Sequence, residues 1–150
     1  MLDIRQDLLN HCTKLREDLG DTISDHLNLE LVSCDKEKGE YVMRSVTEKW
    51  MCNMIGTIHG GMCATLVDQA MGCVAFSAMP GDGVAPTVEL NVMYHRPLLP
   101  DKEIFLNIKL KSVSKQLIHV ACDVFSSDAP EKLCVSATAV YFYKAATEMR

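Results

Sequence analysis

Residues 60–79, GGMCATLVDQAMGCVAFSAM, are polar at only four positions, which are Thr65, Asp68, Gln69 and Ser77. A helix over this stretch is apolar on nearly every face, so it must be covered by other protein segments or by lipid. Asp68 and Gln69 at its centre argue against a membrane span, because a charge inside the bilayer is costly. The stretch therefore predicts a central helix buried in a protein core.

Asp68 is the residue of this helix that needs an explanation. An ionised carboxylate in an apolar site costs several kcal/mol, roughly, unless it gains a partner. One explanation is structural, a carboxylate hydrogen-bonded to a neighbouring strand or loop. The other is functional, a carboxylate that takes part in chemistry.

Composition narrows the class of protein. The 150 residues fit a single domain, 1–150, and the apolar share of 48% is ordinary for a globular chain. The net charge of -5 argues against nucleic acid as a partner. Seven cysteines with no Cys-x-x-Cys and no histidine at zinc spacing favour buried thiols in the reducing cytoplasm. We therefore expect no disulfide and no metal site.

The N-terminal segment has the spacing of an amphipathic helix. Ile4, Leu8, Cys12, Leu15 and Leu19 recur close to every fourth position, with charged residues between them. The segment lacks the basic patch and the uninterrupted apolar run of a signal peptide. We expect a first helix over residues 1–19.

The rest of the chain alternates as β-strands do. Strands are expected over residues 27–31, 41–46, 84–94, 104–110, 118–124 and 133–141. In the third of these, strict alternation puts Thr87 and Glu89 on the same face. The short polar joints between the last four strands suit an antiparallel meander. An α+β fold, with a curved antiparallel sheet wrapped around the central helix, satisfies both patterns, and its free strand edges favour a dimer.

Several motifs then match a known family in the same order. They are Asn53-x-x-Gly56-Thr57-x-His59-Gly60-Gly61, Leu66-x-Asp68 and Thr87-Val88-Glu89-Leu90-Asn91. Together they resemble the hotdog-fold acyl-CoA thioesterases of the phenylacetyl-CoA and hydroxybenzoyl-CoA thioesterase branch. The resemblance implies a hotdog fold, an acyl-CoA substrate, no cofactor, and a site shared between subunits of a homodimer or of a dimer of dimers (a homotetramer).

The resemblance also implies roles for the residues around the helix start. The Gly60 N–H would polarise the thioester carbonyl, and Asp68 would act as general base or as nucleophile. His59 and Asn53 would support them by orienting water or carbonyl. The alternatives are that Gly60-Gly61 only allows close packing of helix and sheet, and that His59 only caps the helix.

Coenzyme A adds phosphates and an adenine, which call for basic and polar groups along a groove. The substrate-binding candidates by resemblance are Thr87, Tyr94, Arg96, Ser114 and Lys115. Ordinary solvated charges at strand ends and turns are the alternative for the last three. The chain departs from some relatives at Gly72, where they carry Ser or Thr.

Two further inferences come from position alone. Cys63, four residues after His59 near the helix start, is a rival nucleophile. His59 and Asp68 are nine positions apart, which on a helix is about 13 Å and places them on opposite faces. If both act on one substrate, they must come from two chains.

The leading hypothesis is thus an acyl-CoA thioesterase. Two other functions remain open on the same fold: a non-catalytic module that binds acyl-CoA, and a hydratase or dehydratase of acyl thioesters.

Overall fold

The computed structural model describes residues 21–145, and the expected helix over residues 1–19 lies outside them. The helices are α2 (Ile23–His26), the 3-10 turn η1 (Lys49–Met51) and α3 (Gly60–Ser77). The strands are β1 (Glu30–Asp35), β2 (Glu40–Val46), β3 (Gly83–Val84), β4 (Thr87–Tyr94), β5 (Glu103–Val113), β6 (Leu117–Ser126), β7 (Ala129–Phe142) and β8 (Lys144–Ala145).

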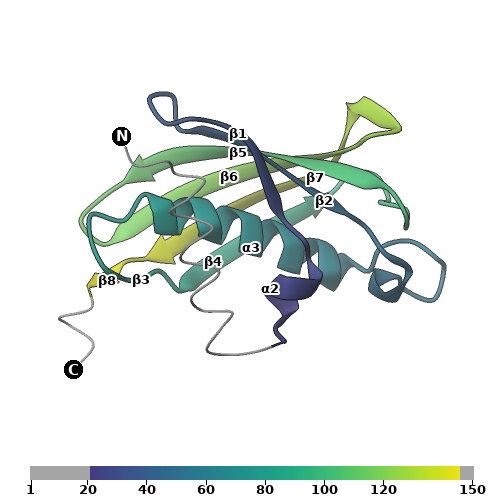
Figure 1. Cartoon of the computed structure of the whole chain (residues 1–150), viewed down its shortest axis with the longest axis horizontal. Coiled ribbons are helices and arrows are strands. Elements are labelled where there is room, and N and C mark those ends of the chain that lie inside the picture. The colour runs from purple at the N-terminus through teal and green to yellow at the C-terminus, as the bar shows by residue number, and fades with distance from the viewer. Residues whose placement is uncertain (1–20, 146–150) are drawn as a thin grey trace.

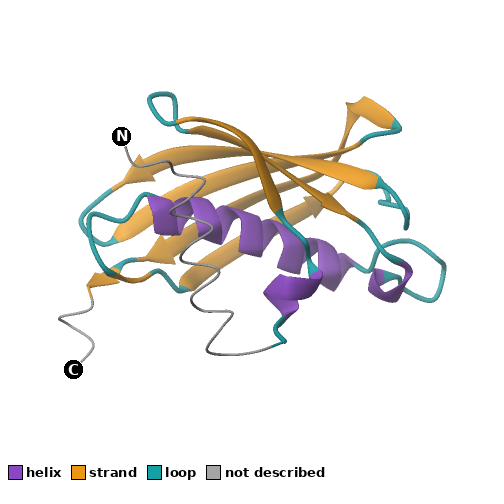
Figure 2. Cartoon of the chain, viewed as in Figure 1, coloured by secondary structure: helices purple, strands orange, loops and turns teal. Residues whose placement is uncertain are grey.

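One antiparallel sheet carries most of the chain and curves around α3 (Figure 1). Its strand order is β1-β2-β5-β6-β7-β4, and β3 and β8 form a separate small pair. Figure 2 shows a two-layer arrangement, with the strands behind and the long helix on the concave side. This confirms the α+β expectation of a curved sheet wrapped around a central helix.

The central helix is fixed at both ends by its own sequence. It begins after His59, whose side chain accepts a hydrogen bond from the Gly61 N–H, and it ends at Ser77, shortly before Pro80. Cys63, Leu66, Val67, Ala70, Met71, Val74 and Ala75 are its buried residues. They face the sheet, where inward side chains of β5, β6 and β7 complete the core.

The expected meander of four consecutive strands is wrong for the first of them, β4, which does not pair with β5. β5, β6 and β7 do follow one another, but β4 pairs with β7 and forms the far edge of the sheet. The connection over residues 95–102 therefore crosses the end of the sheet. Backbone bonds hold it there, from the Ile58 N–H to the Leu98 carbonyl and from the Asp101 N–H to the Thr47 carbonyl, each 2.8 Å long. Leu98 is buried and closes the gap beside the start of α3.

The first strand also begins later than expected. Thr22 and Asp25 form a capping box that starts α2, and Asn28 follows with a positive φ of 45°. Leu27 is therefore part of a turn, although it is fully buried, and the strand starts at Glu30. Among the helices of residues 21–145, none has both the length and the mean hydropathy that a membrane crossing requires.

Candidate active site

The start of α3 presents a backbone N–H that finds no acceptor among the described residues. The Gly61 N–H donates to Nδ1 of His59 at 2.9 Å, and the N–H groups of Met62 and Cys63 donate to the His59 carbonyl. Within residues 21–145, the Gly60 N–H has no such partner. Because the N-terminal end of a helix carries a partial positive charge, this N–H suits a carbonyl oxygen that gains negative charge.

His59 has one ring nitrogen committed to the helix. Its Nδ1 accepts from Gly61, so in this arrangement Nδ1 carries no proton and the opposite nitrogen, Nε2, is the one left to donate. The side chain is exposed. The predicted capping role is therefore seen directly, and Nε2 remains available for a ligand.

Tyr94 covers the other side of the helix start. Its hydroxyl donates to the Gly60 carbonyl at 2.7 Å, and a Cβ added to Gly60 would lie 3.4 Å from the Tyr94 ring. Tyr94 lies at the end of β4, so this contact fixes the helix start against the edge strand. The hydroxyl therefore contacts the carbonyl of the residue whose own N–H has no described partner, although that carbonyl belongs to the next peptide, whose Gly61 N–H is engaged by His59.

Asp68 lies two turns further along α3 and is held by two hydroxyl groups. Oγ1 of Thr87 and the phenol of Tyr141 both donate to its Oδ1, each at 2.9 Å. The same phenol lies 2.9 Å from the Asp68 backbone carbonyl. Among the described residues, no group donates to Oδ2. The carboxylate is thus anchored through one oxygen and free at the other.

A β-bulge makes the Thr87 contact possible. The register of β4 against β7 shifts between Thr87 and Glu89, which leaves Val88 as the extra residue. Thr87 consequently points toward α3, whereas Glu89 faces away and bonds Asn91. The expectation that Thr87 and Glu89 share a face is wrong, because simple alternation does not allow for the inserted residue.

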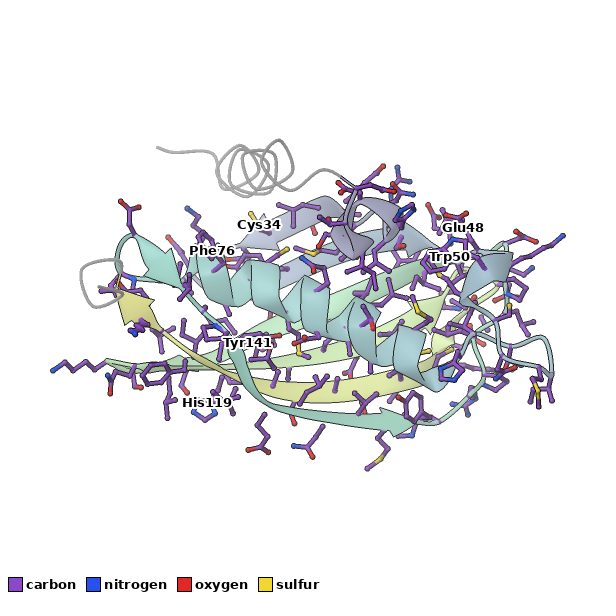
Figure 3. All side chains as sticks on the ribbon, turned by 90° about the horizontal axis from the view of Figure 1, so that it is seen from below. Cys34, Glu48, Trp50, Phe76, His119 and Tyr141 are labelled. Atoms are coloured by element: carbon purple, nitrogen blue, oxygen red, sulfur yellow. The ribbon has the colours of Figure 1, made fainter. Side chains whose placement is uncertain are left out.

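Tyr141 is the functional candidate that sequence analysis missed. It is 1% exposed and lies between α3 and the sheet (Figure 3). Alternation placed it among the inward residues of the last strand, where it looked like ordinary core. The available signal was its hydroxyl, because a buried tyrosine needs a hydrogen-bond partner.

Asn53 is engaged in its own loop. Its Oδ1 accepts from the N–H groups of Ile55 and Thr57 at 3.1 and 3.2 Å, and its Nδ2 donates to Thr57 Oγ1 at 2.8 Å. Gly56 completes the turn with a φ of +81°. The loop leads directly to His59, and one Nδ2 hydrogen of Asn53 remains for a ligand.

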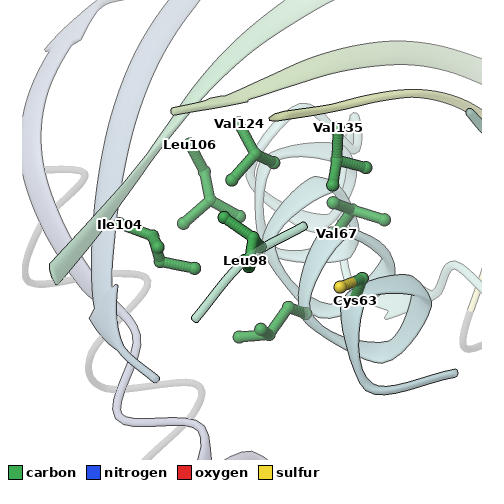
Figure 4. A pocket seen from close by; sticks show the side chains of 8 residues that line it. Cys63, Val67, Leu98, Ile104, Leu106, Val124 and Val135 are labelled. Carbon is green, nitrogen blue, oxygen red and sulfur yellow. The ribbon is translucent and has the colours of Figure 1, made fainter. Parts of the chain in front are cut away.

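Cys63 is poorly suited to act as a nucleophile. It is 4% exposed, and burial raises the pKa of its thiol to about 11. A thiol with that pKa is protonated near neutral pH, and the thiolate is the reactive form. Cys63 packs among apolar side chains between α3 and the sheet, with Leu98 beside it (Figure 4).

The candidate coenzyme A contacts fall at two ends of the sheet. Arg96 follows β4 near the helix start, where its Nη1 donates to the Leu133 carbonyl at 2.8 Å. Ser114 and Lys115 form the turn between β5 and β6, at the other end, where Ser114 Oγ bonds the backbone of Leu117. Within one chain these two sets do not meet, and neither do Gly60 and Asp68.

The family follows from comparison with known proteins. The model of the thioesterase superfamily matches residues 55–133, just over half of the chain, and this range includes both Gly60 and Asp68. The chain belongs to the thioesterase superfamily.

One curated member of the superfamily is similar to this chain over part of its length. Acyl-coenzyme A thioesterase THEM4 from Rattus norvegicus is 32% identical over 88 residues, which are 59% of this chain and 36% of the rat protein. The chain thus spans about a third of that relative's length.

Solved structures show the same fold. Thioesterase superfamily member 2 from Mus musculus superposes with a TM-score of 0.76 at 20% identity, over 95% of this chain and 98% of that one. The smu.793 protein from Streptococcus mutans, solved bound to acetyl CoA, gives 0.68 at 21% identity, over 79% of this chain and 90% of that one. The expected hotdog fold is confirmed.

Proposed function

We propose that this chain hydrolyses acyl-CoA or aroyl-CoA thioesters to the free acid and coenzyme A. The observation that carries the proposal is a pair of groups in a thioesterase-superfamily fold, the Gly60 N–H and Oδ2 of Asp68, that have no partner within residues 21–145. The first suits the oxyanion of a tetrahedral intermediate, and the second suits a nucleophile or a water proton.

The reaction assigns a step to each group. With Asp68 as general base, Oδ2 takes a proton from water while the water oxygen bonds to the carbonyl carbon. The Gly60 N–H stabilises the oxyanion, which collapses as the C–S bond breaks, and the coenzyme A thiolate leaves and is protonated. With Asp68 as nucleophile, Oδ2 itself bonds to the carbonyl carbon, the C–S bond breaks as the coenzyme A thiolate leaves and is protonated, and water then hydrolyses the mixed anhydride to the free acid and the Asp68 carboxylate. His59 Nε2 and the remaining Nδ2 hydrogen of Asn53 would orient the water or the carbonyl.

The proposed site is made by two copies of the chain. β4 is an edge strand, and the exposed apolar residues Val88 and Met93 lie on it, 58% and 63% exposed. Antiparallel pairing of two β4 strands about a two-fold axis at Asn91, with the bulge at Val88 taking up one residue, would bring Thr87 of one copy opposite Tyr94 of the other. Since Thr87 contacts Asp68 and Tyr94 contacts Gly60, Asp68 of one copy would then lie near Gly60 of the second.

The same pairing would join the two groups of coenzyme A candidates. Arg96 follows Tyr94 at the end of β4. In the proposed pairing, this end of one copy would lie beside the end of the other copy's sheet where Ser114 and Lys115 form the β5–β6 turn. A cationic groove of this composition suits the phosphates of coenzyme A. The assembly is proposed as a homodimer or a dimer of dimers, and the cysteine usage favours a cytoplasmic location.

Hydrolysis of a panel of acyl-CoA and aroyl-CoA esters, followed by release of the free thiol, tests the proposed function. We expect turnover on at least one ester. Tight binding of an ester without thiol release would instead assign a non-catalytic acyl-CoA-binding module. Interconversion of enoyl and hydroxyacyl thioesters would assign a hydratase or dehydratase.

A further inference from the structure

Among the described residues, the hydroxyl of Tyr141 hydrogen-bonds with a single one, Asp68. Its neighbours across the sheet are Thr87 on β4 and Ile118 on β6, and its side chain is almost completely buried. A phenylalanine would fill the same space, so the packing of the ring does not require the oxygen. The oxygen lies 2.9 Å from Asp68 Oδ1 and 2.9 Å from the Asp68 carbonyl. Its single proton favours the carboxylate, the stronger acceptor.

Gly72, which has no side chain, leaves room for the Tyr141 ring to pack against α3. It lies one helical turn after Asp68, on the same side of α3. A Cβ at position 72 would lie 3.5 Å from Cε1 of Tyr141, already in van der Waals contact. A larger side chain would push the ring away from the helix, and the hydroxyl with it.

We propose that Tyr141 is a positioning residue for Asp68, which holds Oδ1 so that Oδ2 faces the reacting water or thioester. The proposal rests on thioester hydrolysis at this site. Tyr141 and Thr87 together occupy Oδ1 from two different strands, so the carboxylate cannot rotate without losing both bonds. An oriented carboxylate reacts faster than one that samples several rotamers.

Tyr141 is a permanent donor in this arrangement. Burial, and then the charge of Asp68, raise the pKa of the phenol above its ordinary value, so it keeps its proton at any working pH. The other titratable groups acting on it are the thiols of Cys73 on α3 and Cys122 on β6. No described lysine or arginine forms an ion pair with Asp68.

Tyr141→Phe tests the proposal, because it removes only the hydroxyl. We expect kcat to fall by about tenfold, with KM changed little, since a lost hydrogen bond to a charged group is worth about that factor or more. A residue that only packs would lower the unfolding midpoint and leave kcat of the folded protein unchanged. Tyr143→Phe is the matched control, since that hydroxyl contacts the Asp82 carbonyl at 3.4 Å, and it should leave both readouts at the wild-type value.

A second measurement does not depend on turnover. The Asp68 side chain, compared between crystal structures of the wild-type chain and of Tyr141→Phe, should hold one rotamer in the first and more than one in the second. If the wild-type chain hydrolyses no ester but this loss of order is seen, the proposed function fails and the positioning of Asp68 by Tyr141 stands. Folded Tyr141→Phe with an unchanged kcat and a single Asp68 rotamer would overturn the proposal. Should that variant not fold, Gly72→Val, which displaces the ring, carries the same expectations.

Discussion

At the scale of single residues, the account depends on a carboxylate with one occupied and one free oxygen. Asp68→Asn keeps the shape of the side chain and both hydroxyl contacts at Oδ1, but it replaces the free oxygen Oδ2 with an amide nitrogen and removes the negative charge. We expect turnover to fall by ~100-fold or more while binding of the ester persists, the scale of losing a positioned base. Thiol release and equilibrium binding of a non-hydrolysed CoA ester measure the two effects separately.

The matched control for Asp68→Asn is Asp123→Asn. Asp123 is an exposed carboxylate on β6, and it lies on the face of the sheet away from α3. Its loss should leave turnover within a few-fold, roughly, of the wild-type value. Equal losses in the two variants would show that net charge, and not the position of Asp68, controls the rate.

Cys63 provides a second test at this scale. Its raised pKa of about 11 and its burial predict an inert thiol at pH 7 to 8. Cys63→Ala should therefore keep kcat within a few-fold, roughly, while costing some stability through the small cavity it leaves. Loss of turnover with a normal unfolding midpoint would transfer the chemistry from Asp68 to the thiol.

How far the sequence predicted the site differs from residue to residue. Asp68 and Gly60 stood out because a central charge and a glycine pair are unusual in an apolar helix. The face on which Thr87 lies depends on the bulge at Val88, and alternation cannot show an inserted residue. Tyr141 could not be assigned to Asp68, since that contact joins positions 73 residues apart.

At the scale of elements, the loop before α3 is held by one side chain. Asn53→Ala removes three hydrogen bonds, to the N–H groups of Ile55 and Thr57 and to Thr57 Oγ1. We expect the free energy of unfolding to drop by about 1–2 kcal/mol, because the two N–H groups lose their side-chain acceptor. Urea denaturation of the variant measures this drop.

The control for Asn53→Ala is Asn107→Ala. Asn107 is an exposed amide on β5, away from the loop and from the β4 edge, so its loss should change stability by less than about 0.5 kcal/mol. An Asn53→Ala variant as stable as the wild-type chain would mean that the turn is held by its backbone alone.

The elements themselves were largely predictable, whereas their order in the sheet was not. Period-two patterns located β2, β5, β6 and β7, and the apolar run located α3 to within two residues of its end. The edge position of β4 could not be read from the same pattern. A strand alternates in the same way whether the next connection is a hairpin or a crossover, and residues 95–102 are long enough to reach β5 from the far edge.

At the scale of the whole molecule, the two halves of the proposed site lie apart within one chain. Gly60 and Asp68 are eight residues apart on one rigid helix, about 12 Å along its axis, so no rearrangement of side chains unites them. The loop before the helix also presents Met54 and Ile55 almost fully to solvent, 102% and 83% exposed. Apolar side chains in that position, together with the free edge of β4, favour burial against a second copy.

Subunit complementation tests the shared site most directly. Asp68→Asn and Gly60→Val should each be inactive alone, and mixing them under conditions that exchange subunits should restore activity. At random exchange half of the dimers are hybrids, and each hybrid has one intact site of two, so at most about a quarter of wild-type activity should return. Tagged subunits verify the exchange. No recovery despite verified exchange would mean that Asp68 and Gly60 do not meet across a dimer axis.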